Sequence, residues 1–187
     1  MTTGHVPVHR LDLRLRELAQ LFNSMDPAPF LERDLDRDAE EYIESWAMEH
    51  PAGSRFQITL HLQQAPAQPD SGNLIAEAIH NFFAYKAELA RRELRRLLSQ
   101  GRISLVIGLC FLAACLAAAD AIGRGGSGEL TAIGRESFII NGWVAMWRPV
   151  DIFLYDWWPL LRRRRIYQSL GRAHVGVAVA VAAAAKP

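Results

Sequence analysis

Cysteine is nearly absent from this chain of 187 residues, since Cys110 and Cys115 are the only two. On a helix, side chains five positions apart point in different directions and lie too far from each other to form a disulfide. The six histidines are scattered, and none has acids or cysteines at the spacing of metal ligands. We therefore predict neither a metal site nor a cofactor.

Catalytic motifs are also lacking. The Gly-rich stretch 123–129 is not preceded by a strand or followed by Lys-Ser/Thr, and a phosphate-binding loop needs both. The acidic run 34–40 begins like a calcium loop, but Ala39 replaces the required Gly and Ser45 replaces the final Glu. Because no Ser-His-Asp or Cys-His arrangement is visible either, we expect a protein that is not an enzyme.

The first residues lack the apolar core of a secretory signal, which predicts that the front of the chain stays in the cytosol.

Charge is divided unevenly along the sequence. Residues 1–72 hold 12 acidic and 6 basic side chains, net −6, whereas residues 73–187 hold 8 and 15, net +7. This distribution favours a soluble front part followed by a part that contacts anionic lipid.

Long apolar runs are confined to two segments. Residues 103–119 carry no charge, and 103–122 supplies about 20 residues, enough to cross the ~30 Å hydrocarbon core as a helix. After the polar stretch 123–136, residues 137–161 have the length of a second span. The sequence thus predicts a two-helix transmembrane hairpin over 103–161.

Arg148, Pro149 and Asp151 interrupt the second segment. Arg148 and Asp151 are three positions apart and would face each other on a helix, which lowers the cost of placing each charge in lipid. Either the segment is one kinked span with this pair at mid-depth, or 137–147 dips in and 149–161 lies at the interface. The arginine pattern favours the kinked span. Further polar residues that could line a pathway are Asp120, Asn141 and Asp156.

Arginine residues predict the orientation of the hairpin. They cluster before the first span and after the second, while only Arg124 and Arg135 lie between them, so the positive-inside rule places both termini in the cytoplasm. Beside apolar segments, we expect such clusters to contact anionic headgroups rather than nucleic acid. The expected headgroup contacts are Arg91, Arg92, Arg95, Arg96, Arg102, Arg162, Arg163, Arg164 and Arg165.

Two short segments of the front part alternate apolar and polar residues. They are 8–15 and 56–62, and this alternation is typical of half-buried strands. Between them, residues 36–50 have apolar side chains at helical spacing, with Asp36 or Asp38 as the N-cap.

An amphipathic helix is predicted over 73–100, and Gly101 offers a bend before the first span. The predicted fold class is a membrane protein with a small cytosolic α+β domain, ordered strand-helix-strand-helix, followed by the hairpin. After Leu170 the low complexity predicts a loosely ordered tail. The predicted boundaries are 1–72 for the cytosolic domain, 73–102 for the connecting helix, 103–122 and 137–161 for the hairpin, and 162–187 for the basic tail.

The loop 23–30, NSMDPAPF, suits recognition of a partner. Its two prolines restrict its shape, and its polar side chains can bond nearby backbone. The same features also describe a rigid connector whose Phe30 enters the core. The candidate interaction residues are Asn23, Ser24, Asp26, Pro27, Pro29 and Phe30.

Three stretches together resemble a family of small bacterial two-span membrane proteins: FNSMDPAPFLERDLDRDAEEYIESWA, GRISLVIGLCFLAACL and GWVAMWRPVDIFLYDWWP. The resemblance covers nearly all of residues 10–165. It implies a location in the bacterial inner membrane and a shared architecture, and it brings no activity and no catalytic residue with it.

Two functions are compatible with these features. The first is an accessory or regulatory membrane protein, whose cytosolic domain binds a protein partner while the hairpin holds it at the membrane. The alternative is a small oligomeric channel or transport subunit that uses the polar residues of the second span. We favour the first, because two spans alone cannot enclose a pore without forming an oligomer.

Overall fold

The computed structural model describes residues 7–64, 71–125 and 128–179, which form two compact units. The first unit contains the described chain up to Ala90 and again from Arg162 onward, and the second unit is Arg91–Leu161. The long helix α2, Ser71–Gly125, contributes residues to both units.

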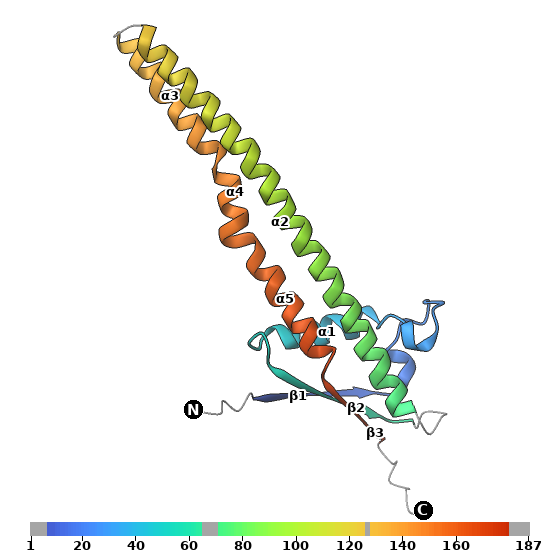
Figure 1. Ribbon diagram of the computed structural model, residues 1–187. Helices are drawn as coiled ribbons and strands as arrows, with labels where there is room; N and C mark the ends of the chain where they lie inside the picture. Colours follow the sequence, from blue (N-terminus) through green and yellow to red (C-terminus); the bar gives the residue numbers. More distant parts are fainter. Residues whose placement is uncertain (1–6, 65–70, 126–127, 180–187) are drawn as a thin grey trace, which may run out of the picture. The chain divides into compact units, whose positions relative to one another are not determined.

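A parallel sheet forms one layer of the first unit (Figure 1). Its register pairs Leu13 with Leu60, and Leu60 in turn with Val177. Because side chains alternate along a strand, the apolar residues of all three strands project from the same face. In spatial order the strands are β1 (Val8–Leu15), β2 (Arg55–Leu62) and β3 (His174–Val179).

Strand β3 corrects the prediction of a loosely ordered tail after Leu170. Val175 and Val177 pair with Ile58 and Leu60 of β2, so the sheet is completed only after the chain has passed through all of its long helices. The first unit is therefore an α/β arrangement with three parallel strands, not the predicted order of two strands and two helices. Residues 180–187 of the predicted tail lie outside the described part of the chain.

Helices cover the apolar face of the sheet. Helix α1 (Arg37–Met48) begins after Asp36, whose carboxylate accepts the Asp38 N–H at 3.0 Å, as expected for an N-cap. Most of the remaining core comes from the start of α2 and from α5 (Trp157–Leu170). Their fully or nearly fully buried side chains are Ile75, Ala78, Ile79, Phe82, Phe83, Ile166, Tyr167 and Leu170.

Helix α2 joins the predicted connecting helix to the first predicted span without a break. Gly101, where we expect a bend, is helical and lies against Ile152, whose Cγ2 is 2.7 Å from the position that a Cβ would occupy. Close packing therefore explains this glycine. Among the described residues, one helix, Gly72–Gly125, is long and apolar enough to cross a membrane by length and composition.

The predicted second span is not one regular helix. Pro149 has no N–H to donate to the carbonyl of Ala145, four residues earlier. That carbonyl oxygen lies 3.2 Å from the position of a Cβ on Gly108, so the glycine leaves room for it. The helix breaks here and then continues beyond the predicted end at 161. Its parts are α3 (Glu129–Ala145), α4 (Trp147–Asp151), a π-helical turn η3 (Ile152–Asp156) and α5.

Within the second unit, α3 and α4 pack antiparallel to the second half of α2 (Figure 1). Gly142 lies against Leu112 and Cys115, while Gly134 is nearest to Ile122, toward the other end of the pair. The buried and half-buried positions of α2 recur at alternating spacings of four and three residues, as in paired helices. They include Gly101, Leu105, Gly108, Leu112, Cys115, Ala119 and Ile122.

Candidate functional site

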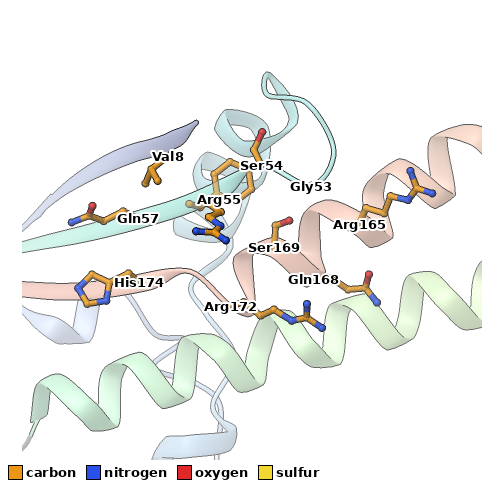
Figure 2. A pocket seen from close by; sticks show the side chains of 11 residues that line it. Val8, Gly53, Ser54, Arg55, Gln57, Arg165, Gln168, Ser169, Arg172 and His174 are labelled. Carbon is orange, nitrogen blue, oxygen red and sulfur yellow. The ribbon is translucent and has the colours of Figure 1, made fainter. Parts of the chain in front are cut away.

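A pocket of about 710 Å³ lies where the three strands of the first unit begin (Figure 2). Val8, Arg55 and His174 are the first residues of their strands, and parallel pairing brings them to one edge of the sheet. This is the edge opposite to the one at which open α/β sheets usually bind ligands. The lining, called the basic pocket below, consists of Val8, Gly53, Ser54, Arg55, Phe56, Gln57, Arg165, Gln168, Ser169, Arg172 and His174.

Two turns place the polar side chains of the basic pocket. The turn before β2 requires Gly53 at φ +93°, and the Ser54 N–H donates to the carbonyl of Pro51 at 3.2 Å. The turn after α5 is held to α2, because His80 donates from Nε2 to the carbonyl of Ala173 at 2.7 Å. A Cβ on Gly171 would lie only 3.5–3.6 Å from the α2 backbone, so this turn packs closely against the helix. Arg172 lies between these two contacts.

The basic pocket carries three positively charged side chains and no negatively charged one. Arg55, Arg165 and Arg172 are exposed, and the lining contains no Asp or Glu. Within the described ranges, none of these three guanidinium groups has an ion-pair partner. With two serine hydroxyls and two glutamine amides beside them, the pocket can bind an anion through charge-assisted hydrogen bonds.

Two of the arginines that we expect to contact lipid bind α1. Arg163 donates from Nε to Glu44 at 2.9 Å and to the hydroxyl of Tyr167 at 3.0 Å, and its Nη2 lies 2.8 Å from the same Glu44 oxygen. Arg162 donates to the carbonyl of Met48. Because Arg165 lines the basic pocket, three arginines of the run 162–165 have roles within the first unit.

The contacts of Arg163 explain two pKa shifts in this cluster. Burial raises the pKa of the Tyr167 phenol above its usual range, and the Glu44 carboxylate raises it further. Burial lowers the pKa of Arg163, but the Tyr167 hydroxyl and Glu44 more than offset this effect, so the pKa is raised overall. Tyr167 therefore stays neutral and Arg163 stays charged at physiological pH, which favours a structural role for the cluster.

The candidate interaction loop is held in shape by its own hydrogen bonds. Asn23 Oδ1 accepts from the Met25 N–H at 2.9 Å, and the Asp26 carboxylate accepts from Asp34 at 2.7 Å and Ala28 at 3.0 Å. These backbone donors, that of Asp34 first, lower the pKa of Asp26. Phe30 packs on Phe22 at a ring-centroid distance of 4.9 Å, whereas Ser24, Pro27 and Pro29 are exposed. Short 3-10 turns flank the loop at η1 (Leu18–Gln20) and η2 (Phe30–Glu32).

Arg148 does not pair with Asp151, contrary to the prediction. Its Nη1 lies 3.5 Å from Asp156 Oδ2, and within the described residues Asp151 has no ion pair. Eight residues of regular α-helix make about 2.2 turns, which would leave Asp156 well to one side of Arg148. The π-helical turn takes up about one additional residue and brings the two side chains onto one side.

The predicted polar pathway is not assembled within the second unit. Asp120 pairs with Arg124 on the same helix at 2.6 Å, and the Asn141 amide donates to the carbonyl of Ser137 at 2.8 Å. Asp156 pairs with Arg148, as described above. Each candidate thus has a partner close by in its own segment, and no contact joins the three.

Packing between the helices places Arg148 and Asp156 relative to the apolar run of α2. Gly101 faces Ile152, and Gly108 faces Ala145 and Met146, so Arg148 lies about one helical turn from the level of Arg102. Asp156 lies beyond Gly101, at the level of the arginine-rich part of α2. The pair is therefore near the end of the apolar run 103–122, not at its middle.

Arg148, Asp156 and Asp151 provide a matched test of this pairing. We expect Asp156→Ala to destabilise the protein by about 1 kcal/mol, as for a partly exposed ion pair, and Asp151→Ala to have a smaller effect. The double variant Arg148→Ala/Asp156→Ala should cost less than the sum of its single changes. The measurement is the thermal aggregation midpoint of the purified protein. Strictly additive single costs would contradict the pairing.

Sequence reasoning singled out Arg165 as an anion-contacting residue but missed the other residues of the basic pocket. Arg55 looked like the residue before a strand, and Arg172 belonged to a segment predicted as tail. The alternation of valine at Val175 and Val177 is a signal for a third strand, whose start would share one edge of the sheet with the starts of the other two.

No protein-family model, curated protein or solved structure matches this chain.

Proposed function

We propose that this protein is an integral membrane accessory protein of the bacterial inner membrane. In this proposal the helices of Arg91–Leu161 form a transmembrane hairpin, which holds the three-stranded unit at the cytoplasmic face for a protein partner. The observation that supports the hairpin most directly is the pairing of β3 with β2. If α2 crosses the membrane, the chain must cross back, because strands on opposite sides could not pair.

The surface of the helical pair supports a lipid environment. Large apolar side chains are exposed on α2 and equally on α3, for example Ile107 (64%) and Trp143 (64%). Soluble proteins rarely expose a continuous apolar surface of this kind, whereas lipid-facing helices require one. Other exposed members are Ile103, Val106, Leu109, Phe111, Leu116, Ile133, Ile140, Val144 and Trp147.

The contact between the helices has the composition expected in a membrane. Gly101, Gly108 and Gly142 allow the backbones to approach closely, and Cys115 and Ala119 are also small. In lipid, helices associate through packing of small residues because lipid tails are as apolar as leucine side chains. The proposal thus explains why glycines occur inside long helices, where they would otherwise lower helix stability.

Reporter fusions test the topology. A reporter active only outside the cytoplasm should be active when inserted near Ser127 and inactive when fused at Met1 or Lys186. Nine arginines lie in residues 91–102 and 162–165, toward one end of the hairpin, whereas two, Arg124 and Arg135, lie toward its other end. The positive-inside rule therefore predicts this orientation. Activity at Lys186 with inactivity at Met1 would mean a single crossing and would refute the hairpin.

Co-purification tests the accessory role. The intact chain, extracted in mild detergent, should retain a protein partner in fixed stoichiometry. The channel alternative instead expects a large homo-oligomer, because two spans per chain cannot enclose a pore. A detergent-corrected mass of a monomer or dimer together with a partner supports the accessory role. A higher homo-oligomer without a partner would support the alternative.

A further inference from the structure

We propose that the basic pocket binds a phosphate group, carried either by a lipid headgroup or by a small soluble molecule. The site lies wholly within the first unit, at the common starting edge of the three strands (Figure 2). This inference goes beyond the proposed anchoring function, and it requires that the residues before α2 and those after α5 lie on the same side of the membrane. A single crossing would separate Arg55 from Arg172 and exclude the pocket, whereas a failure of the co-purification test would leave the inference unaffected.

The first argument is the contrast between these arginines and others in the chain. Arg124, Arg148 and Arg163 each have a carboxylate partner within 4 Å. In the described ranges, the three arginines of the basic pocket have none, although they line one hollow from different elements. Like charges gathered without a counter-charge repel each other, and a bound anion would remove that cost.

The second argument is the chemistry of the donors. A guanidinium group offers a planar fork of N–H donors that matches the oxygens of phosphate, and Arg55 approaches from β2 while Arg172 approaches from the turn after α5. The Ser169 hydroxyl and the amides of Gln57 and Gln168 add neutral donors. A tetrahedral anion can use donors from several directions at once, as this arrangement provides.

The third argument is size and wall chemistry. A volume of about 710 Å³ falls in the range of small-molecule sites, larger than a bare phosphate needs. Val8 and Phe56 supply apolar wall beside the charged groups. The pocket therefore suits a phosphate monoester with a small organic body, and the absence of acids from its lining disfavours cationic ligands.

The experiment uses the intact chain in nanodiscs of phosphatidylcholine, titrated with inorganic phosphate at constant ionic strength against potassium chloride. We expect a saturable rise in the thermal midpoint. Arg55→Gln/Arg172→Gln should weaken the affinity by about tenfold or more, the loss expected for charge-assisted hydrogen bonds. The matched control is Arg14→Gln, an exposed arginine of β1 outside the pocket, which should bind like the parent.

A second arm distinguishes the two sources of phosphate. In nanodiscs that also contain phosphatidic acid, a headgroup in the pocket should raise the midpoint of the parent but not of Arg55→Gln/Arg172→Gln. Added phosphate should then have little further effect. If the natural source is soluble, the phosphate response should persist unchanged in these nanodiscs.

Two results would overturn the site. One is the lack of a saturable response in the parent, with either phosphate or phosphatidic acid. The other is an equal response in the parent and the double variant, which would indicate general charge screening. The midpoint of each variant without ligand shows that it is folded, and Ser169→Ala, which removes a neutral donor and no charge, should weaken binding to a smaller extent.

Discussion

A chain that ends at Leu170 is expected to lose the fold of the whole first unit, although only the last 17 residues are missing. The truncation deletes β3, so β2 loses its partner along six registered pairs. Two half-buried valines contribute about 2 kcal/mol together, and each backbone hydrogen bond of the ladder adds about 1 kcal/mol. Together, the lost valine burial and ladder hydrogen bonds approach the free energy of unfolding of a small domain, about 5–15 kcal/mol.

A second truncation provides the control for this experiment. A chain that ends at Val179 keeps every described strand and helix, and it should melt like the parent. The readouts are the thermal midpoint of the purified chain and the resistance of residues 7–64 to trypsin. If the chain ending at Leu170 resisted trypsin as well as the chain ending at Val179, β3 would not be needed for the fold of the first unit.

Gly142→Leu is expected to destabilise the helical pair by about 1–3 kcal/mol, as for overpacking of a close contact. A Cβ at this position would lie 2.8 Å from Leu112 Cδ1 and 3.1 Å from Cys115 Cβ. The Leu112 methyl group can move, but Cβ of Cys115 is tied to the α2 backbone. Relief therefore requires the helices to separate, which loses packing along the whole contact.

Gly134→Ala provides the matched comparison within α3. Its new Cβ would meet only Ile122 Cγ2 at 4.0 Å, an ordinary contact, so the gain in helix propensity of up to ~1 kcal/mol should stabilise the protein. Gly142→Ala makes the same chemical change but should not stabilise, because the tight contact opposes it. Equal thermal midpoints for the two alanine variants would show that α3 and α2 do not approach each other as described.

Local patterns predicted several elements of the first unit. Alternation in 8–15 and 56–62 indicated strands that the structure has at nearly the same bounds, and Asp36 is the N-cap of α1. These features depend on interactions within a few residues, such as a cap bonding the first turn of a helix. The long uncharged run 103–119 likewise predicted a helix with the length and composition of a span.

The helical segment from α3 to α5 shows where local patterns fail. On a regular helix, residues three positions apart face each other, which predicts that Asp151 is the partner of Arg148. The π-helical turn changed the angular position of Asp156 relative to Arg148, and it is this residue that approaches. The sequence also did not show that Arg148 lies near the start of the apolar run 103–122 of α2, because that position depends on which α2 residues the segment contacts.

The sequence by itself determined which segments are apolar, where α1 begins, and where the arginines cluster along the chain, since each of these depends on neighbouring residues. Only the tertiary structure decided that 174–179 completes the sheet, that Arg163 binds Glu44, and that Arg55 and Arg172 share one pocket. These facts join residues that are more than a hundred positions apart. Such contacts form because parallel pairing and burial of one sheet face bring distant segments together, and periodicity within a segment carries no information about its partner.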